Sequence, residues 1–214
     1  MPLRRFLARA LLTCLLACAS GFSGGPQKVR TVYDGDTVCL ETHRQVRYIG
    51  IDAPEIDPET HEGEYLAHRA RAFNKDLVER GRIRLEHDRV QKDRYGRVLA
   101  YVFLEDGRMV NALMVERGLA YVMTTPPNMK YTSLLLDCQR RAMRGNRGIW
   151  RRLSKKSGMR YTGNKRSFRF HIQDCPFGKK ISKRHRMEFS TLYEAFWAGY
   201  SPCDACRPAA VLKK

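Results

Sequence analysis

Short β-rich runs joined by tight turns are the feature that most restricts the fold of this chain. Asp34-Gly35 lies between the runs KVRTVY and DTVCLE, and an Asp-Gly pair in that setting is a strong hairpin signal. Three more runs, VRYIGID, RIRLEHD and GRVLAYVFL, have the composition of strands. Helical segments interrupt these runs without a regular strand–helix–strand alternation, so the pattern predicts an α+β fold, a small barrel with helices packed on it.

Three segments are expected to supply those helices. The first, at residues 61–81, repeats apolar residues at helical spacing: Leu66, Ala70, Phe73 and Leu77. The second covers residues 109–118 and the third runs from about 131 to 142. Residues 148–158 are polar and basic, and they form the expected boundary before a second, smaller unit.

The charge of the chain indicates a polyanionic partner. Forty Lys and Arg against 22 Asp and Glu give a formal net charge of +18 and a pI near 10.0. Residues 151–214 hold 16 Lys and Arg against 4 Asp and Glu, so most of the excess lies in the tail. Nucleic acid and an anionic membrane surface are both candidate partners, and a basic surface kept only for solubility is the plainer alternative.

The first twenty residues are typical of a secretory signal peptide. A cationic start, MPLRRF, precedes an apolar run that is too short to span a bilayer comfortably. Two endings compete: an A-x-A cleavage site at residues 17–19, and a lipobox at 15–18 with Cys18 as the lipidated residue. Either predicts a bacterial protein that is secreted, periplasmic or envelope-anchored, and an uncleaved anchor is the alternative. GFSGGPQ is expected to be a flexible lead-in to the first strand.

Two aspartates are placed to form a cation site. Asp36 begins the second strand and Asp52 ends the third. A turn centred near residues 43–44 predicts that they lie opposite or nearly opposite each other, ~5 Å apart. Like charges repel there, so a hard cation such as Ca²⁺ or Mg²⁺ is expected to compensate. Because Arg47 and Asp52 would point to opposite faces of a flat strand, the strand must bend, near Gly50, for both to face the site.

Arg47, Glu55 and Arg97 complete a candidate hydrolytic set around that pair. Two guanidinium groups can bind the non-bridging oxygens of a phosphodiester and stabilise the charge that builds on phosphorus. A carboxylate can orient or deprotonate the attacking water. Taken singly, each residue favours a plainer interpretation, with Asp34 and Asp36 as turn residues and the arginines as part of a solvated face.

A series of motifs carries a family resemblance over residues 28–152. In order they are DGDT, VRYIGIDAPE, GEYLA, KDRYGRVLAYV, DGRMVN, GLAYV and GIW. The series resembles the successive motifs of the staphylococcal nuclease family. The resemblance implies a five-stranded Greek-key barrel of the oligonucleotide/oligosaccharide-binding (OB) type with three helices. It also implies Ca²⁺-dependent hydrolysis of phosphodiester bonds in DNA, with RNA as a second candidate substrate.

The resemblance implies a role for each matched position that faces the metal. Asp36 and Asp52 match the calcium-binding carboxylates, and Ala53 matches a position that contributes its backbone carbonyl. Asp34 would lie next to these ligands without contacting the metal itself. The loss of a side-chain hydroxyl at Ala53 therefore need not remove that ligand.

The positions that face the substrate are matched as well. Arg47 and Arg97 match the two phosphate-binding arginines, and Glu55 matches the proposed general base. Arg94 and Tyr95 lie where the family contacts the terminal phosphate of a bound nucleotide. Every charged position of the set is present, which favours a catalyst over a non-catalytic nucleic-acid-binding protein, the main alternative.

One departure from the family affects substrate binding. Before the Pro-Asn pair the family often has tyrosines on which a base can stack, whereas residues 123–128 read MTTPPN. Base stacking contributes ~1–3 kcal/mol per base. We therefore expect altered substrate preference with the hydrolytic residues intact.

The tail contains a set of potential zinc ligands. His171-x₃-Cys175 and Cys203-x₂-Cys206 offer one nitrogen and three sulfurs, sufficient for a tetrahedral structural Zn²⁺. A unit of about fifty residues with few apolar core residues needs a bound metal or another cross-link to be stable. A Cys203–Cys206 redox pair and a disulfide involving Cys175 are the alternatives. Cys39 is expected to be a buried small hydrophobe, as is Cys138, or the two could form a disulfide.

The tail also resembles small modules related to the N-terminal zinc domain of the bacterial Ada DNA-repair protein. That domain uses four cysteines, so His171 removes the basis for methyl-acceptor chemistry here. Basic residues between the ligand pairs are suited to phosphate contacts: Lys179, Lys180, Lys183, Arg184 and Arg186. A zinc-stabilised cap with a solvated basic face and a tether to an anionic envelope are the alternatives. The expected organisation is a signal at 1–20, a nuclease domain at 28–152 and a zinc module at 160–210, in a monomer.

Overall fold

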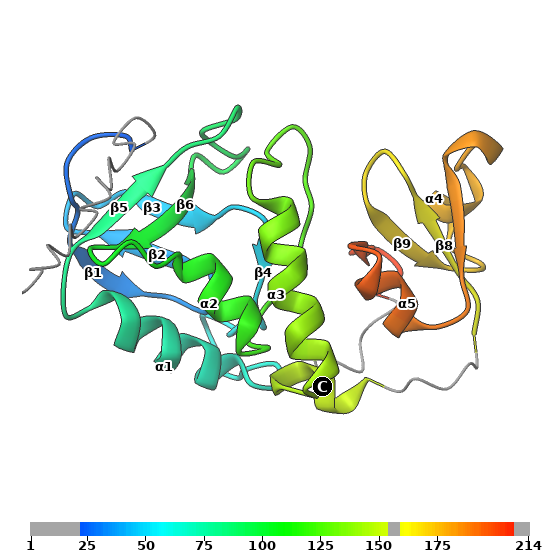
Figure 1. The fold of residues 1–214 in the computed structure, drawn as a ribbon, viewed down its shortest axis with the longest axis horizontal. Coiled ribbons are helices and arrows are strands. Elements are labelled where there is room, and N and C mark those ends of the chain that lie inside the picture. The colour runs from blue at the N-terminus through cyan, green and yellow to red at the C-terminus, as the bar shows by residue number, and fades with distance from the viewer. Residues whose placement is uncertain (1–21, 154–158, 208–214) are drawn as a thin grey trace, which may run out of the picture.

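The computed structural model describes residues 22–153 and 159–207. The expected export signal at residues 1–20 lies outside them. The described chain forms two units that lie side by side, with the helix α3 (Thr132–Arg144) between the larger unit and the smaller one (Figure 1). Within the described residues, no helix is both long enough and apolar enough to cross a bilayer.

The larger unit is built on the five-stranded sheet that the sequence predicts. Its strand order is β1-β2-β3-β6-β5, and β3 and β6 are the one parallel pair among these neighbours. The strands are β1 (Val29–Val32), β2 (Thr37–Leu40), β3 (Gln45–Tyr48), β5 (Ile83–Glu86) and β6 (Val98–Leu104). Their inward side chains form the main core, in which Val38, Leu40 and Val46 are fully buried.

The segment before β1 joins the two edges of this sheet. Ser23 N donates to Leu85 O at 2.8 Å, and Gln27 and Ile83 exchange two backbone hydrogen bonds of 2.7 and 2.8 Å. Because Gln27 runs directly into β1, one stretch of chain pairs with β5 and then with β2. The sheet is thereby closed into a barrel. The expectation of a flexible lead-in is wrong for residues 22–27.

The third predicted strand is broken where the sequence requires a bend. Gly50 has a φ of +79° and separates β3 from β4 (Ile51–Asp52). A Cβ there would come within 2.8 Å of the Leu135 side chain, so glycine is needed for conformation and for space. β4 leaves the barrel sheet and pairs with β7 (Tyr121–Val122), which places Asp52 opposite Tyr121. The predicted bend near Gly50 is confirmed.

The predicted pairing of Asp36 with Asp52 is wrong. Thr37 pairs with Arg47 and Cys39 with Gln45, so the turn is centred about two residues earlier than expected. The tight turn depends on His43, which adopts a left-handed φ of +61°. That conformation is uncommon for a residue other than glycine. The two aspartates come together through the bend at Gly50, not through strand pairing.

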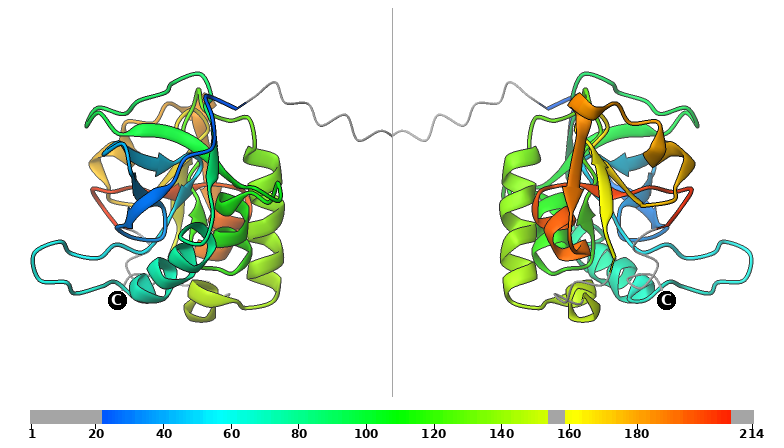
Figure 2. Two further views of the ribbon diagram at one scale, coloured as in Figure 1. Left: turned by 90° about the vertical axis from the view of Figure 1, so that its left-hand side faces the viewer. Right: turned by 90° about the vertical axis from the view of Figure 1, so that its right-hand side faces the viewer.

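Helices cover the barrel below and beside the sheet (Figure 1). They are α1 (Ala67–Val78), α2 (Val110–Glu116) and α3, followed by the 3₁₀ helix η1 (Gly148–Arg152). The first helix begins six residues later than predicted because Leu66 has a left-handed φ of +67°, which helical geometry excludes. The segment between β4 and α1 projects away from the body (cyan in Figure 2).

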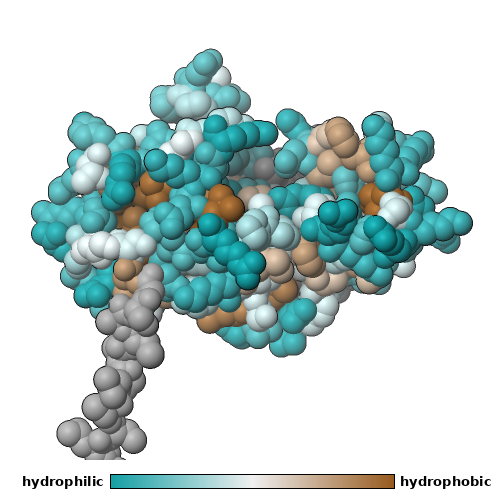
Figure 3. Space-filling model, turned by 90° about the horizontal axis from the view of Figure 1, so that it is seen from above, coloured by the Kyte–Doolittle hydropathy of each residue, from teal (hydrophilic) through white to brown (hydrophobic). Residues whose placement is uncertain are grey.

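The smaller unit is a four-stranded sheet with two short helices. Its strand order is β10-β8-β9-β11. The elements are β8 (Tyr161–Asn164), β9 (Arg169–Ile172), α4 (Pro176–Lys179), η2 (Lys183–His185), β10 (Arg186–Phe189), α5 (Leu192–Trp197) and β11 (Ser201–Pro202). Seen from above, the surface over both units is mostly hydrophilic, with apolar residues in small separate patches (Figure 3).

The two units share a second hydrophobic core. Tyr121 and Trp150 from the larger unit pack with Phe170 and Phe196 from the smaller one. Phe196 is fully buried, and its ring makes edge contacts with the other three rings at centroid distances of 5.2 to 5.4 Å. Burial of several aromatic rings between the units holds them in a fixed packing.

Candidate active site and metal centre

Arg47 is the centre of the polar cluster at the bend. Its guanidinium is almost fully buried and lies 3.1 Å from Asp36 Oδ1 and 2.8 Å from Asp52 Oδ1. It also donates to the backbone carbonyls of Tyr48 at 3.0 Å and Ile51 at 2.9 Å. One side chain therefore fixes both sides of the break at Gly50. Three of the predicted site residues, Asp36, Arg47 and Asp52, are brought together.

Asp36 is held by hydrogen bonds from several directions. Its side chain is 1% exposed, and its carboxylate accepts from Ala53 N at 2.6 Å and from Thr37 Oγ1 at 3.0 Å. Its own backbone N–H donates to Asp34 Oδ1 at 2.8 Å, which closes the Asp34–Asp36 turn. A Cβ at Gly35 would lie 2.6 Å from the Cβ of Ala53, so this turn packs too tightly for any other residue.

The charges around Asp36 do not balance. Burial raises the pKa of Asp36 well above its ordinary value, while the charge of Arg47 opposes that shift. Three further carboxylates raise the pKa of Asp36 again: Asp34, Asp52 and Glu55. Four carboxylates thus act on one another around one buried guanidinium. Carboxylate oxygens are the ligands that Ca²⁺ and Mg²⁺ prefer, so the residues present fit a hard divalent cation.

Tyr121 is a residue of this cluster that sequence reasoning missed. Its hydroxyl donates to Asp52 Oδ2, on the far side of that carboxylate from Arg47. Burial, and then the charge of Asp52, raise the pKa of Tyr121 well above its ordinary value, so the phenol remains a donor. In the sequence Tyr121 is only part of the motif GLAYV, and the pairing of β4 with β7 is what shows that it faces Asp52.

Glu55 lies at the solvent edge of the cluster. It begins the projecting segment, and its backbone N–H donates to Glu64 Oε2 at 2.9 Å while Glu64 N donates back to Glu55 O at 2.9 Å. The segment is ordered further by Asp57, whose carboxylate accepts from two backbone N–H groups. Glu55 is exposed, and its charge acts on the buried Asp36.

Arg97 belongs to a neighbouring basic group. Its Nε donates to Asp93 Oδ2 at 2.7 Å, and its guanidinium lies 5.6 Å from the centre of the Tyr95 ring. Arg94 stacks on the same ring at 4.8 Å. Tyr95 is 68% exposed and lines a surface hollow together with Arg44, Lys92 and Arg97. Arg94, Tyr95 and Arg97 are thus brought together, next to a hollow that is positively charged.

The loop at residues 123–128, which lacks the tyrosines of the family pattern, is bound by the smaller unit. Thr124 is buried, and Pro126 and Pro127 are joined by a cis peptide bond. Arg169 from β9 donates to Thr124 O at 3.1 Å and to Ser201 Oγ at 2.6 Å. Where the family often has exposed tyrosines, the smaller unit holds the loop.

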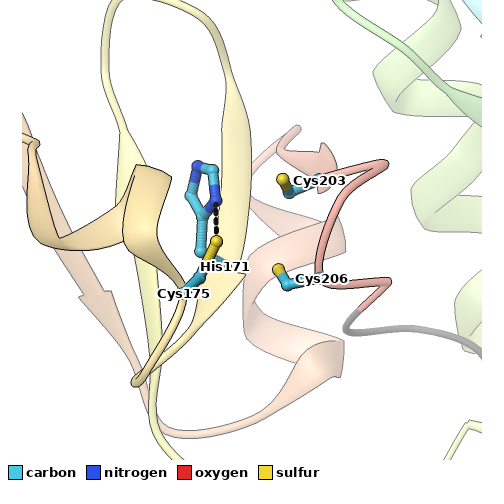
Figure 4. Close-up of side chains that lie close together, drawn as sticks. All are labelled: His171, Cys175, Cys203 and Cys206. Carbon is cyan, nitrogen blue, oxygen red and sulfur yellow. Dashed lines mark hydrogen bonds between the residues drawn. The ribbon is translucent and has the colours of Figure 1, made fainter.

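The structure brings together the four side chains that were predicted as zinc ligands. The ligand atoms of His171, Cys175, Cys203 and Cys206 all lie within 4.8 Å of one another. His171 on β9 and Cys175 before α4 face the two cysteines of the loop after β11, and His171 Nδ1 is 3.4 Å from Cys175 Sγ (Figure 4). A tetrahedral zinc with bonds of ~2.3 Å requires sulfurs ~3.8 Å apart. The donors present therefore fit that ion.

Two of the four ligands, His171 and Cys175, are shifted toward their metal-binding forms, whereas burial raises the pKa of the Cys206 thiol to about 12. Burial lowers the pKa of His171, helped by the charge of Arg169, so its imidazole is neutral. Burial tends to raise the pKa of the Cys175 thiol, but hydrogen bonds led by one from the backbone of Gly178 outweigh it and lower that pKa. Neutral imidazole and thiolate are the metal-binding forms. All five described cysteines are free, and Cys39 and Cys138 are buried in the larger unit, as predicted.

Comparisons with known proteins agree with the barrel site. The family model described as staphylococcal nuclease homologue matches residues 45–152. A thermonuclease of Staphylococcus intermedius is 41% identical over 128 residues, which cover 58% of this chain and 75% of that protein. A thermonuclease of Staphylococcus hyicus is 37% identical over 127 residues, 58% of this chain and 74% of that one. Endonuclease YncB of Bacillus subtilis (strain 168) is 34% identical over 122 residues, 55% of this chain and 57% of that protein.

Barrel, carboxylate cluster and similarities together define a class, the hydrolytic nucleases, which cleave phosphodiester bonds in nucleic acid. More particularly, the chain belongs to the staphylococcal nuclease family, a metal-dependent family whose barrel is of the OB type. The residues matched by the family model end at Arg152, before the smaller unit begins.

Proposed function

We propose that this nuclease hydrolyses DNA, and RNA as a second substrate, with a Ca²⁺ ion held by Asp36, Asp52 and the backbone carbonyl of Ala53. The observation that supports this most is the cluster of carboxylates around one buried guanidinium, at Arg47. When bound, such an ion supplies a Lewis acid to the phosphodiester and a water of lowered pKa. Side chains of the protein would bind the phosphate, stabilise its developing charge and accept the proton of the attacking water.

Each substrate-facing residue has a proposed task. Arg47 and Arg97 bind the non-bridging oxygens and stabilise the negative charge of the transition state. Glu55, at the solvent edge, orients the attacking water and accepts its proton. The exposed Tyr95 ring, with Arg94 stacked on it, is suited to contact the terminal phosphate of a bound nucleotide.

Residues 28–152 are proposed as the nuclease domain and residues 160–210 as a zinc module. His171, Cys175, Cys203 and Cys206 would hold a structural Zn²⁺. Basic residues between these ligand pairs are proposed to add phosphate contacts: Lys179, Lys180, Lys183, Arg184 and Arg186. Such contacts give affinity that is independent of sequence and falls steeply with salt.

Export from a bacterial cell is proposed on the sequence of residues 1–20 alone, in secreted, periplasmic or envelope-anchored form. An exported protein is exposed to an oxidising compartment, where free cysteines tend to form disulfides but zinc-bound cysteines stay reduced. The redox state of the cysteines therefore tests whether zinc is bound. We also propose that the protein is a monomer. Its basic tail would bind anionic membrane as a secondary partner.

Cleavage of single-stranded DNA by the purified protein tests the metal site. We expect hydrolysis with added Ca²⁺, loss of hydrolysis with EGTA, and loss in Asp36→Ala. Asp106→Asn is the matched control, since the exposed Asp106 pairs with Arg108 of its own turn, outside the carboxylate cluster, and should leave cleavage intact. Cleavage by Asp36→Ala at the wild-type rate would place the metal elsewhere.

A further inference from the structure

The smaller unit rests on the strand that carries a metal-site carboxylate. On β7, Tyr121 pairs with Asp52 of β4, and its hydroxyl donates to Asp52 Oδ2. The ring of the same tyrosine packs edge-on against Phe196 of α5, with centroids 5.4 Å apart and planes at 61°. A single buried side chain thus contacts the active site at its polar end and the smaller unit along its ring.

Phe196 is itself held rigidly. Its fully buried ring lies 5.2 Å from Trp150 and 5.3 Å from Phe170, and both contacts are edge-on. It therefore has packing partners from both units. A ring confined on these sides offers Tyr121 a fixed surface.

A second link runs through the backbone beside the first. The fully buried Gln139 on α3 donates from Nε2 to Phe196 O at 2.6 Å and accepts from Val122 N at 2.7 Å. Val122 follows Tyr121 on the same short strand. Since β7 has two residues, both of them are tied to Phe196, one through its ring and one through Gln139.

We propose that the C-terminal module is part of the catalytic-metal site, and that Phe196 positions Tyr121 so that its hydroxyl fixes the carboxylate of Asp52. This inference rests on the proposed cation at Asp36 and Asp52. Arg47 holds Asp52 Oδ1 and Tyr121 holds Oδ2, so the rotation of the carboxylate is set from both sides. Tyr121 and Phe196 are positioning residues: neither supplies a ligand, and the loss of either lets the carboxylate turn.

The size of the effect follows from what outer hydrogen bonds do for metal ligands. Removing the partner that orients a ligand typically lowers metal affinity ~10–100-fold. Because Arg47 still holds one oxygen, we expect the lower end of that range for Tyr121→Phe. Phe196→Leu keeps the hydroxyl and loosens its direction, so its effect should be smaller.

Calorimetric titration of the full chain with Ca²⁺ tests the proposal without relying on turnover. Tyr121→Phe should weaken Ca²⁺ binding about tenfold and recover most of its cleavage rate at saturating Ca²⁺, since it leaves the packing intact. The double variant Tyr121→Phe/Phe196→Leu should bind Ca²⁺ no more weakly than Tyr121→Phe, because Phe196 acts through the hydroxyl that is already gone. Phe189→Leu is the matched control: Phe189 is buried in the module against Tyr200 at 4.9 Å. That control should lower Tm without weakening Ca²⁺ binding.

Two outcomes would overturn the proposal. Wild-type Ca²⁺ affinity in Tyr121→Phe would show that the hydroxyl does not position Asp52. Equal losses in Phe196→Leu and Phe189→Leu would assign the effect to general destabilisation of the module. If the unmodified protein itself bound no Ca²⁺, the cation site proposed above would be wrong instead, and the two failures are therefore distinguishable.

Discussion

Arg169, in the smaller unit, donates a hydrogen bond of 3.1 Å to the backbone carbonyl of Thr124, in a loop of the barrel. The same guanidinium nitrogen donates to Ser201 Oγ at 2.6 Å, so the loop is tied to β11 as well as β9. In the family this loop often presents tyrosines to the substrate base. Here the loop has instead become a contact between the two units, and its shape depends on the C-terminal module.

Arg169→Ala should loosen this loop and weaken substrate binding. The loss of one charge-assisted hydrogen bond corresponds to roughly a tenfold increase in KM for single-stranded DNA. The kcat should change little, because Arg169 touches neither Arg47 nor the carboxylates. Steady-state kinetics beside Arg166→Ala, an exposed arginine of the same hairpin, measures this. A fall in kcat with KM unchanged would contradict a role confined to the loop.

Arg47→Lys should disable the site although the positive charge is kept. A lysine offers one ammonium group and cannot span Asp36 Oδ1, Asp52 Oδ1 and two backbone carbonyls as Arg47 does. Losing one well-placed donor to transition-state charge lowers kcat ~10²–10³-fold. Single-turnover cleavage measures it, with the exposed Arg82→Lys as control. Retention of more than a tenth of the wild-type rate would show that charge, not shape, is what Arg47 contributes.

Chemistry that resides in the side chains themselves could be predicted from the sequence. His171 and the three cysteines have the donor types and spacing of a metal site, and the structure brings them together. The bend at Gly50 could be predicted too, because Arg47 and Asp52 cannot face the same side of a flat strand.

Relationships set by tertiary packing could not be predicted. The register of β2 and β3 depends on the left-handed conformation of His43, which no turn motif signals. The pairing of Asp52 with Tyr121 joins two strands of two residues each, too short for any periodicity. The position of Phe196 against Tyr121 depends on docking between units that are separate in sequence.

Asp93→Asn should destabilise the fold in a pH-dependent way. Burial tends to raise the pKa of Asp93, but the hydrogen bonds from the side chain and backbone of Arg97 outweigh it and lower that pKa. Because the folded-state pKa lies below the unfolded value of about 3.9, the stabilisation is complete above that pH. It is lost as the pH falls through the folded-state pKa.

The free energy of unfolding in urea, measured for wild type and Asp93→Asn from pH 7 downward, tests this sign. The wild type should be more stable at pH 7, and the difference should shrink below about pH 4. Loss of the partner that orients Arg97 should also lower cleavage. A difference that grew as the pH fell would mean that the carboxylate of Asp93 is not stabilised by Arg97.

Removal of a metal from the C-terminal module should affect both units. Cys203→Ser replaces a thiolate with a hydroxyl that zinc binds poorly, so we expect the zinc content by elemental analysis to fall from one equivalent per chain to near zero. Since bound metal contributes folding free energy directly, Tm should fall as well. Ca²⁺ affinity should fall with it, because Cys203 N donates a hydrogen bond of 2.9 Å to the backbone carbonyl of Phe170, which belongs to the shared core around Phe196.

Cys39→Ala is the matched control, since Cys39 is buried on β2 of the barrel and belongs to no metal cluster among the residues described. It should keep one zinc per chain. If Cys203→Ser kept its zinc and Cys206→Ser did too, the four side chains would be a thiol cluster without a metal. Zinc lost without any change in Ca²⁺ affinity would mean that the packing around Phe196 survives without the metal, and that the module supports the active site through its hydrophobic core alone.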